Sequence, residues 1–381
     1  MARIENKILV GNWMEQWRNI TPGSVQTCVT SVPYWGLRDY GITPTWWDEH
    51  DESCQFHDPD QDGFCSCGAW YGVYGLEPTP ELYVKHTVQV FEHVKSLLTD
   101  DGTLWLNIGD THWGGKGRSG EESIESAIDR ESRGKSYTHS KRKVNQDIRP
   151  QDRNHEFIKP KDLVGIPWMV AFALRDQGGW YLRSDIIWNK KNPMPESVKD
   201  RPTRTHEHIF LFSKSKHYYY DAEAIREPAS PTSHARVSKS TMDRVKAERE
   251  QGKSTTDNDI QINHKQGKRS EGAKSNENFH KAMVLQTETR NKRDVWTVET
   301  NQTGNVTHTA SFPPKLISPC ILAGSKEGDI VLDPFGGTGT TAEVALNYGR
   351  KFLICEISED YVEKELKPKI KRALSKPKLI Y

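Results

Sequence analysis

The stretch that decides the fold of this 381-residue chain is VLDPFGGTGTT, residues 331–341. Its apolar start predicts a buried strand that ends at Asp333, and a helix is expected to begin near Thr340. The glycines between them let the backbone pass close to a ligand. The first N–H groups of a helix have no partner within the helix and favour a polar ligand. The stretch therefore predicts a binding loop between a strand and a helix.

A second apolar strand follows at residues 351–356 and ends in Glu356. A carboxylate in this place is suited to accept hydrogen bonds from both hydroxyls of a ribose. The loop lacks the lysine of a phosphate-binding loop and the glycine spacing of a dinucleotide fingerprint. An ordinary glycine-rich turn is the alternative, but the order strand, glycine loop, helix, strand and carboxylate favours a nucleoside-containing cofactor.

Alternating strands and helices in the rest of the chain predict a doubly wound α/β sheet. Expected strands lie at residues 7–11, 25–30, 103–108, 181–188, 208–213, 330–333 and 351–356. Expected helices lie at residues 14–19, 80–98, 163–176, 314–323, 340–348 and 359–374. Residues 46–75 are expected to form a loop, and residues 116–161 and 230–293 are polar tracts.

The composition sets limits on the class of protein. Only 34% of the residues are hydrophobic and 28% are charged, so part of the chain is expected to lie outside the core. The net charge is +1, so any basic surface must be local. The 6 cysteines are too scattered for a disulfide scaffold. With neither a signal peptide nor a membrane-spanning stretch in the sequence, we expect a cytoplasmic protein.

A second loop with chemical character is SVPY, residues 31–34, which follows the apolar strand at residues 25–30. An exocyclic amino group on a base ring is a poor nucleophile, and it improves when two acceptors hold its protons. The Ser31 hydroxyl and the Val32 carbonyl are candidate acceptors, and Pro33 restricts Val32 to extended conformations. Tyr34 is a candidate to stack on a base drawn out of a duplex. A strand-ending turn with a surface aromatic is the alternative.

Together the two loops resemble the β class of DNA amino-methyltransferases. That family carries Ser/Asp/Asn-Pro-Pro-Tyr/Phe near the N-terminus and Asp-Pro-Phe-x-Gly-x-Gly-Thr-Thr near the C-terminus. The catalytic loop precedes the cofactor loop here, which is the circularly permuted order of the class. The resemblance implies a Rossmann-like sheet that uses S-adenosylmethionine to methylate an exocyclic amino group in double-stranded DNA. A cognate restriction endonuclease, as a separate chain, is a candidate partner.

The resemblance also assigns cofactor-binding positions. It covers the glycine loop, the carboxylate strand, the segment before the helix at residues 314–323, and the turn after the first strand. The implied residues are Asn12, Phe312, Asp333, Phe335, Gly337, Gly339, Thr340 and Glu356. The family usually has Asp where this chain has Asn12, and Asn is still expected to accept a hydrogen bond from the adenine amino group of the cofactor.

The family's domain plan implies a catalytic domain built from both ends of the chain. It would comprise residues 1–191 and 294–381, with a polar insert near residues 116–161. Residues 192–293 would form the target-recognition insert, partly mobile. Candidate contacts to DNA phosphates are Lys190, Lys191, Arg201 and Arg204, for which an ordinary solvated surface is the alternative.

The base identity and the activity are open at this point. Ser31 is typical of cytosine-N4 enzymes, whereas Asp in that place is typical of adenine-N6 enzymes, so we expect cytosine N4. Val32 replaces the first proline of the family's tetrapeptide and retains the carbonyl but not the ring. Alternatives are therefore adenine-N6 methylation, a DNA-binding relative that has lost catalysis, and a methyltransferase that acts on RNA or on a protein glutamine.

A cysteine-rich segment is a candidate zinc site. Its residues are Cys54, His57, Cys65 and Cys67. Four such ligands would make a closed, structural site. The Cys-x-Cys spacing is tighter than the usual Cys-x2-Cys, and a thiol-containing surface loop is the alternative.

Overall fold

We describe the protein from a computed structural model. The structure describes residues 6–37, 41–48, 54, 59–60, 62–114, 155–229, 289–300 and 312–375. The chain forms two compact units, the larger made of Met1–Ala224 with Arg293–Tyr381 and the smaller of Ile225–Lys292. The N-terminal and C-terminal parts of the chain therefore share one unit.

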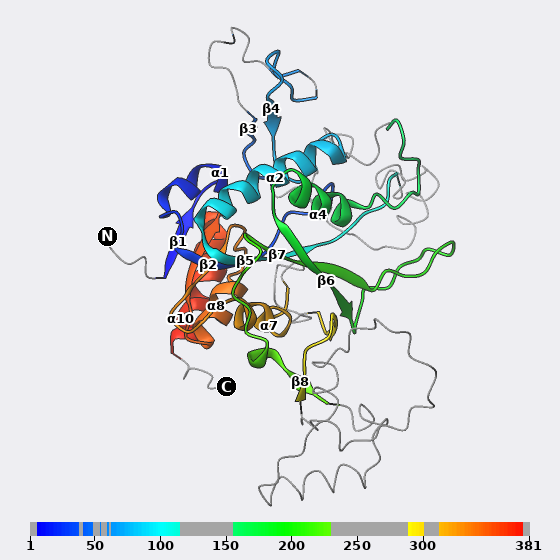
Figure 1. The fold of residues 1–381 in the computed structure, drawn as a ribbon. Coiled ribbons are helices and arrows are strands. Elements are labelled where there is room, and N and C mark those ends of the chain that lie inside the picture. The colour runs from blue at the N-terminus through cyan, green and yellow to red at the C-terminus, as the bar shows by residue number, and fades with distance from the viewer. Residues whose placement is uncertain are drawn as a thin grey trace, which may run out of the picture. The chain divides into compact units, whose positions relative to one another are not determined.

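The larger unit is built on an eight-stranded sheet with the order β1-β12-β11-β2-β5-β7-β6-β10 (Figure 1). Its neighbouring strands are parallel except for β7, which is antiparallel to both β5 and β6. In chain order the strands are β1 (Lys7–Val10), β2 (Val25–Ser31), β5 (Leu98–Ile108), β6 (Tyr181–Lys190), β7 (His206–Ser213), β10 (Val295–Val298), β11 (Ile330–Asp333) and β12 (Lys351–Glu356). The predicted doubly wound sheet is confirmed.

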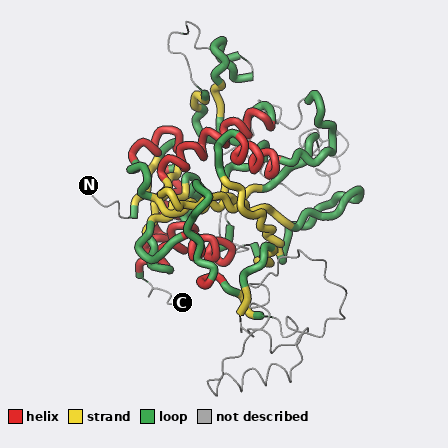
Figure 2. The backbone as a smooth tube through the Cα atoms, viewed as in Figure 1, coloured by secondary structure: helices red, strands yellow, loops and turns green. Residues whose placement is uncertain are grey.

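Helices cover both faces of this sheet (Figure 2). On one face lie α2 (Pro80–Leu97) and α4 (Ile166–Asp176), and on the other lie α7 (Pro314–Gly324), α8 (Thr340–Asn347) and α10 (Lys367–Leu374). Shorter helical segments are α1 (Trp13–Gln16), η1 (Trp17–Asn19), η3 (Glu223–Ile225), α9 (Glu359–Tyr361) and η5 (Val362–Leu366), the last a π-helical turn. None of the helices within the described ranges is long and apolar enough to cross a membrane.

The start of α2 follows from its sequence. The Thr79 side chain accepts a hydrogen bond from the backbone N–H of Leu82, and Pro80 occupies the first helical position, where no N–H is needed. Tyr83, Phe91 and other apolar side chains of one stripe are buried against the sheet. The helix predicted at residues 80–98 is thus confirmed, and it supports the strands that carry both loops.

One prediction about an element was wrong, and one strand was not predicted. Part of the loop expected at residues 46–75 forms an antiparallel pair, β3 (Thr45–Trp47) with β4 (Trp70–Gly72). Cross-strand aromatic packing stabilises this pair, since Trp46 and Tyr71 have ring centroids 5.0 Å apart. The strand β10 was not predicted from the sequence. It forms because Trp296 is buried and the backbone pairs with β6.

The order of the strands creates a crevice at one edge of the sheet. From β11 the chain continues to β12 on one side, whereas from β2 it continues to β5 on the other side. The neighbouring strands β11 and β2 therefore flank the point where the winding direction reverses. Ligands of open α/β sheets bind outside the carboxyl ends of the strands at this point. The two predicted loops begin at those ends, at Asp333 and Ser31.

The smaller unit is described only near its ends. There β8 (Glu227–Pro228) pairs with β9 (Thr289–Arg290), and Arg290 forms an ion pair with Glu227 at 2.9 Å. The predicted insert began at residue 192, whereas the compact unit begins at Ile225, because β7 is a central strand of the main sheet. The assignment of residues 192–293 to target recognition stays a prediction. Most of the polar tract at residues 116–161 lies outside the described residues.

Candidate active site

A buried carboxylate joins the two predicted loops. Asp333, at the end of β11, accepts hydrogen bonds from the hydroxyls of Thr30 in β2 and Thr341 in α8, both at 2.7 Å. It also accepts from the backbone N–H of Phe335 at 3.0 Å. Burial raises the pKa of Asp333 to about 6. These bonds connect β2, the glycine loop and α8.

The glycine loop follows a path that larger residues would block. A Cβ on Gly336 would lie 2.0 Å from the Ile354 side chain, so only glycine lets the loop pass against β12. Gly339 has a φ of 80° and occupies the N-cap of α8. The Lys369 ammonium donates to the Thr338 hydroxyl at 2.9 Å from beneath the loop. The predicted binding loop is therefore preformed.

Glu356 ends β12 beside this loop. Its carboxylate accepts from the backbone N–H of Gly337 at 2.7 Å and of Ser358 at 2.9 Å. Burial raises its pKa above the ordinary range for a glutamate. Each carboxylate oxygen has a second lone pair, so both can still accept from the hydroxyls of a ligand. A buried carboxylate held by backbone donors is oriented for that task.

Asn12 and Phe312 lie at the same crevice. The Asn12 amide oxygen caps α1 by accepting from the Met14 N–H at 3.0 Å, and its amide nitrogen donates to the Thr45 hydroxyl at 3.2 Å. Phe312 is buried two residues before the start of α7. Asn12 therefore has a structural role in addition to the cofactor contact predicted for it.

One cavity of about 720 Å³ brings the predicted residues together. Its lining contains all the predicted catalytic and cofactor-binding residues except Gly339, namely Asn12, Ser31, Val32, Pro33, Tyr34, Phe312, Asp333, Phe335, Gly337, Thr340 and Glu356. A cavity of this size holds a nucleoside cofactor. The Glu356 carboxylate and the side-chain-free backbone at Gly337 fit the ribose and the polar part of such a molecule.

The catalytic loop is held from several sides. Ser31 is the last residue of β2 and lies opposite Asn107 of β5 in the sheet register. The Pro33 carbonyl accepts from the Tyr83 hydroxyl of α2 at 2.9 Å. The Tyr34 hydroxyl donates to Glu207 at 2.7 Å and to the Asn107 amide oxygen at 3.1 Å. Burial, and next the charge of Glu207, raise the pKa of Tyr34 well above its usual value.

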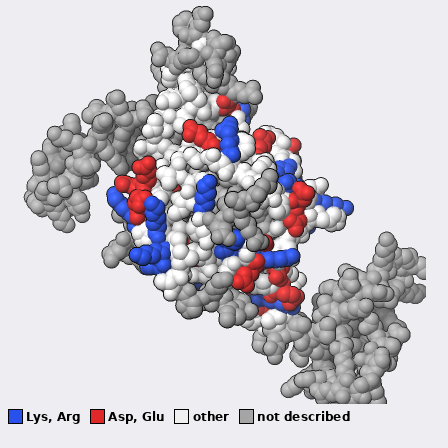
Figure 3. Space-filling view, turned by 90° about the vertical axis from the view of Figure 1, so that its left-hand side faces the viewer, with Lys and Arg blue, Asp and Glu red and all other residues white. Residues whose placement is uncertain are grey.

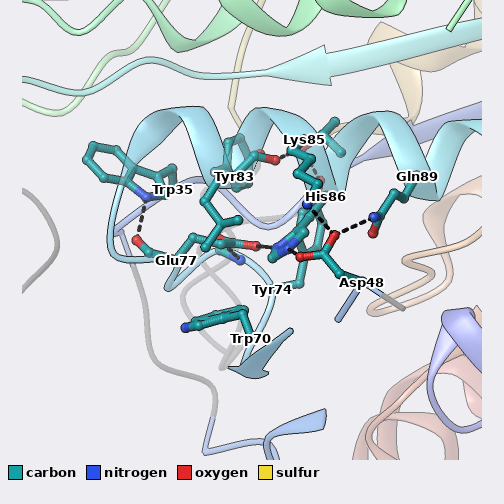
Figure 4. Close-up of polar contacts among 12 residues, drawn as sticks. Trp35, Asp48, Trp70, Tyr74, Glu77, Tyr83, Lys85, His86 and Gln89 are labelled. Atoms are coloured by element: carbon teal, nitrogen blue, oxygen red, sulfur yellow. Dashed lines mark hydrogen bonds and ion pairs between the residues drawn. The ribbon is translucent and has the colours of Figure 1, made fainter. Parts of the chain in front are cut away.

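A buried polar network supports the loop from behind (Figure 4). The Glu77 carboxylate accepts from the Gly75 N–H at 2.8 Å and faces His86 Nδ1 at 3.0 Å. The Gly75 carbonyl in turn accepts from the N–H of Gly36, directly after the catalytic loop, at 2.7 Å. The Trp35 indole donates to the Glu77 carbonyl at 2.9 Å. This network connects α2 to the catalytic loop, and sequence reasoning did not find it.

Two further residues of the cavity were missed. Asn107 is the second-to-last residue of β5 and Glu207 is the second residue of β7, and both line the cavity. A polar residue at the end of an apolar strand is a signal that was available in the sequence. It did not show that β5 and β7 are neighbours, which only the sheet order establishes.

The predicted phosphate contacts differ in their surroundings. Lys190 lines the cavity and pairs with Glu207. Lys191 is exposed and pairs with Glu299 at 2.8 Å. Arg201 pairs with Glu196, and Arg204 donates to the backbone carbonyl of Asp110. On the face drawn in Figure 3, basic side chains of described residues lie among acidic ones.

Three of the four predicted zinc ligands lie close together. The Sγ atoms of Cys54, Cys65 and Cys67 all lie within 4.8 Å of one another. The Cys54 and Cys65 sulfurs are 3.4 Å apart. Three thiolates bound to one zinc ion at about 2.3 Å would have their sulfurs about 3.8 Å apart, so the spacing fits the ion. The fourth predicted ligand, His57, lies outside the described residues.

Comparison with known proteins identifies the family of this chain. A family model described as DNA methylase matches residues 25–367. The chain is 37% identical over 353 residues to the Type II methyltransferase M.Cfr9I of Citrobacter freundii, covering 93% of this chain and 84% of that protein. It is 36% identical over 355 residues to the Type II methyltransferase M.SmaI of Serratia marcescens, covering 93% and 87%.

A solved structure shares the fold. PvuII DNA methyltransferase, described as cytosine-N4-specific, superposes with a TM-score of 0.51 at 14% identity and covers 98% of this chain and 92% of that chain. The family model and the relatives extend over most of the chain, and both predicted loops line one cavity. The chain therefore belongs to the N6/N4 DNA methylase family and is an S-adenosylmethionine-dependent DNA methyltransferase.

Proposed function

We propose that this enzyme methylates N4 of cytosine within a short site in duplex DNA. The observation that carries the proposal is the position of Ser31, which lines the same cavity as the glycine loop and Glu356. Serine is the residue type that is typical of cytosine-N4 members of the family at this position. Bases are out of reach inside a duplex, so the target base must be flipped into the cavity.

The loop residues have separate roles in this chemistry. The Ser31 hydroxyl and the Val32 carbonyl accept the two amino protons and direct the nitrogen lone pair toward the methyl group. S-adenosylmethionine, when bound, supplies that methyl group in electrophilic form. The Tyr34 ring, held by Glu207 and Asn107, offers a face for the flipped base. A Cβ on Gly109 would lie 2.5 Å from this ring, so a glycine there admits it.

Val32 is compatible with activity. Its side chain is buried, with 3% exposed, so packing holds the residue even without a proline ring. Pro33 still restricts its backbone to extended conformations. We infer that the carbonyl keeps the direction that the family's proline would impose, and that Val32→Pro leaves the rate similar or raises it.

Nucleoside mass spectrometry of DNA methylated by the purified enzyme tests the proposal. We expect N4-methylcytosine, and Ser31→Ala should lower the rate on the order of a hundredfold. N6-methyladenine would replace the proposal by its adenine alternative. If the wild type produces neither base and Val32→Pro is active, the chain is an inactivated relative.

We also propose that Cys54, His57, Cys65 and Cys67 bind one structural zinc ion. The support is the clustering of the three described sulfurs on the segment between β3 and β4. Four protein ligands leave no open position, so the ion would stabilise this segment rather than take part in methyl transfer.

Elemental analysis of protein purified in metal-free buffer tests the zinc site. We expect about one zinc per chain, and Cys65→Ser should lose it and lower the melting temperature. Cys320→Ala is the matched control, because Cys320 is buried in α7 and outside the cluster. Zinc-free wild-type protein whose melting is unchanged by a chelator would refute the site.

The remaining assignments rest on the family's relatives. The relatives named above are Type II methyltransferases. We propose that this enzyme likewise has a cognate restriction endonuclease and acts in the cytoplasm.

We propose further that residues 192–293 recognise the target sequence and that Lys191, Arg201 and Arg204 contact phosphates. Their present partners are acidic side chains or a carbonyl, which phosphate oxygens can replace.

A further inference from the structure

The cavity contains an ion pair that methyl transfer, as described above, does not use. Lys190 in β6 and Glu207 in β7 pair with each other, and both line the cavity together with Ser31 and Tyr34. Their side chains are 22% and 15% exposed, so the pair is largely withdrawn from water. Withdrawing two charges from water is costly. Ligand sites are mostly apolar with a few placed polar or charged groups, so a pair of this kind in a cavity is a candidate for ligand recognition.

Glu207 holds its neighbours in place. One carboxylate oxygen accepts from the Tyr34 hydroxyl at 2.7 Å and from the Asn107 amide at 3.2 Å. The other oxygen accepts from the Lys190 ammonium. The carboxylate thereby connects a residue of the catalytic loop to a residue on β6, and it sets the position of both.

Lys190 has hydrogen-bonding capacity beyond this pair. An ammonium carries three N–H donors, more than the ion pair with Glu207 requires. Its nitrogen lies 4.9 Å from the centre of the Trp188 ring, which further limits where the ammonium can go. A positioned cationic donor in the cavity selects a ligand with an acceptor at that place.

Cytosine and adenine differ in whether they carry a hydrogen-bond acceptor beyond the ring nitrogen next to the amino group. When the amino nitrogen of either base lies at Ser31, a ring nitrogen acceptor follows next along the base edge. Beyond it cytosine presents its 2-carbonyl oxygen, whereas adenine presents a C–H group. A donor placed there makes a hydrogen bond with cytosine and loses it with adenine.

We propose that Lys190 reads the 2-carbonyl oxygen of the flipped cytosine, with Glu207 as the positioning residue that orients both Lys190 and Tyr34. The inference rests on the proposed cytosine-N4 function and assigns its base selectivity to a residue outside the catalytic loop. It also moves Lys190 from a phosphate contact to a base contact.

A substrate analogue isolates the contact. Duplexes carry at the mapped target position either cytosine or an aminopyridine C-nucleoside, which keeps the amino group and the adjacent ring nitrogen but lacks the 2-carbonyl oxygen. A hydrogen bond to a charged donor corresponds to roughly a 10- to 100-fold effect. We therefore expect the analogue to lower kcat/KM of the wild type by about that factor, and to lower that of Lys190→Met by less than about threefold.

Variants separate this role from general effects. Lys191→Met is the matched control, since loss of a phosphate contact lowers kcat/KM equally for cytosine and for the analogue. Glu207→Gln should lower the cytosine-to-analogue ratio in the same direction as Lys190→Met. Lys190→Arg should restore part of that ratio, because it retains a cationic donor.

The outcomes are distinct. If the wild type methylates the analogue and cytosine at equal rates, Lys190 does not read the base, and this result needs no variant that folds. The same conclusion follows if Lys190→Met lowers the rates for cytosine and for the analogue equally. The cytosine-N4 function stands in that case. If the methylated base in the mapped site is adenine, the proposed function itself fails.

Discussion

At the scale of single residues, two carboxylates organise the cofactor side of the cavity. Asp333 also lines the cavity but is 1% exposed and binds three donors from the chain, so it acts as a structural connection between loops. Glu356 lines the cavity and is held by backbone donors, and its remaining lone pairs are available to a ligand. The two acids differ in role because of what surrounds them.

Glu356→Ala tests the ribose contact. Hydrogen bonds to a charged group contribute about 1.5–3 kcal/mol, so we expect S-adenosylmethionine to bind roughly ten- to a hundredfold more weakly. Calorimetric titration measures the affinity directly. Equal affinity of the two proteins would show that the ribose lies elsewhere. Glu343→Ala, in α8 and outside the cavity lining, serves as control.

Asp333 predicts a pH dependence of stability. Its pKa is raised by burial from an ordinary value of 3.8 to about 6 in the folded protein, so the folded state holds a proton that the unfolded state releases. Stability therefore falls as pH rises through this window, by about 2 kcal/mol between about pH 4 and pH 7. Asp333→Asn removes this slope. Urea unfolding of both proteins checks it, and parallel pH profiles would contradict the assignment.

At the scale of elements, α2 supports the catalytic loop. The His86 ring of α2 stacks on Trp47 of β3 at 4.7 Å and on Trp70 of β4 at 5.4 Å, while its Nδ1 faces Glu77. The β3–β4 pair, the helix and the loop after Tyr34 thereby share one buried network (Figure 4). Hydrogen bonds connect the network to the catalytic loop, whereas its contact with the glycine loop is the stacking of Tyr74 on Phe335 at 5.6 Å.

Glu77→Gln tests whether the network affects the catalytic loop without affecting the glycine loop. It keeps the shape of the side chain and removes the charge that holds the Gly75 N–H and His86, so we expect kcat to fall by about tenfold. The affinity for S-adenosylmethionine should stay the same, since Asp333 and Glu356 are untouched. Single-turnover rates and calorimetry give the two quantities. Glu92→Gln, on the exposed face of α2, is the matched control. A loss of cofactor affinity would contradict the separation.

At the scale of the whole molecule, the circular permutation leaves the site intact. The strands β11 and β12 come last in the chain but lie between β1 and β2 in the sheet. Asp333 and Thr30, which are 303 positions apart in the sequence, are hydrogen-bonded. The position of the site depends on strand neighbours at the switch point and not on the order in which the chain supplies them.

Much of the fold and the cofactor loop was predictable from the sequence, and much of the base-facing side was not. The glycines, the strand ends at Asp333 and Glu356, and the SVPY loop are local patterns, because backbone path and strand period are properties of neighbouring residues. The pairing of Tyr34 with Glu207 spans 173 positions and exists only because β7 runs antiparallel between β5 and β6. Only the tertiary structure showed that Lys190 faces the cavity. The charge of a side chain follows from the sequence, whereas its neighbours on other strands depend on the order of the strands in the sheet.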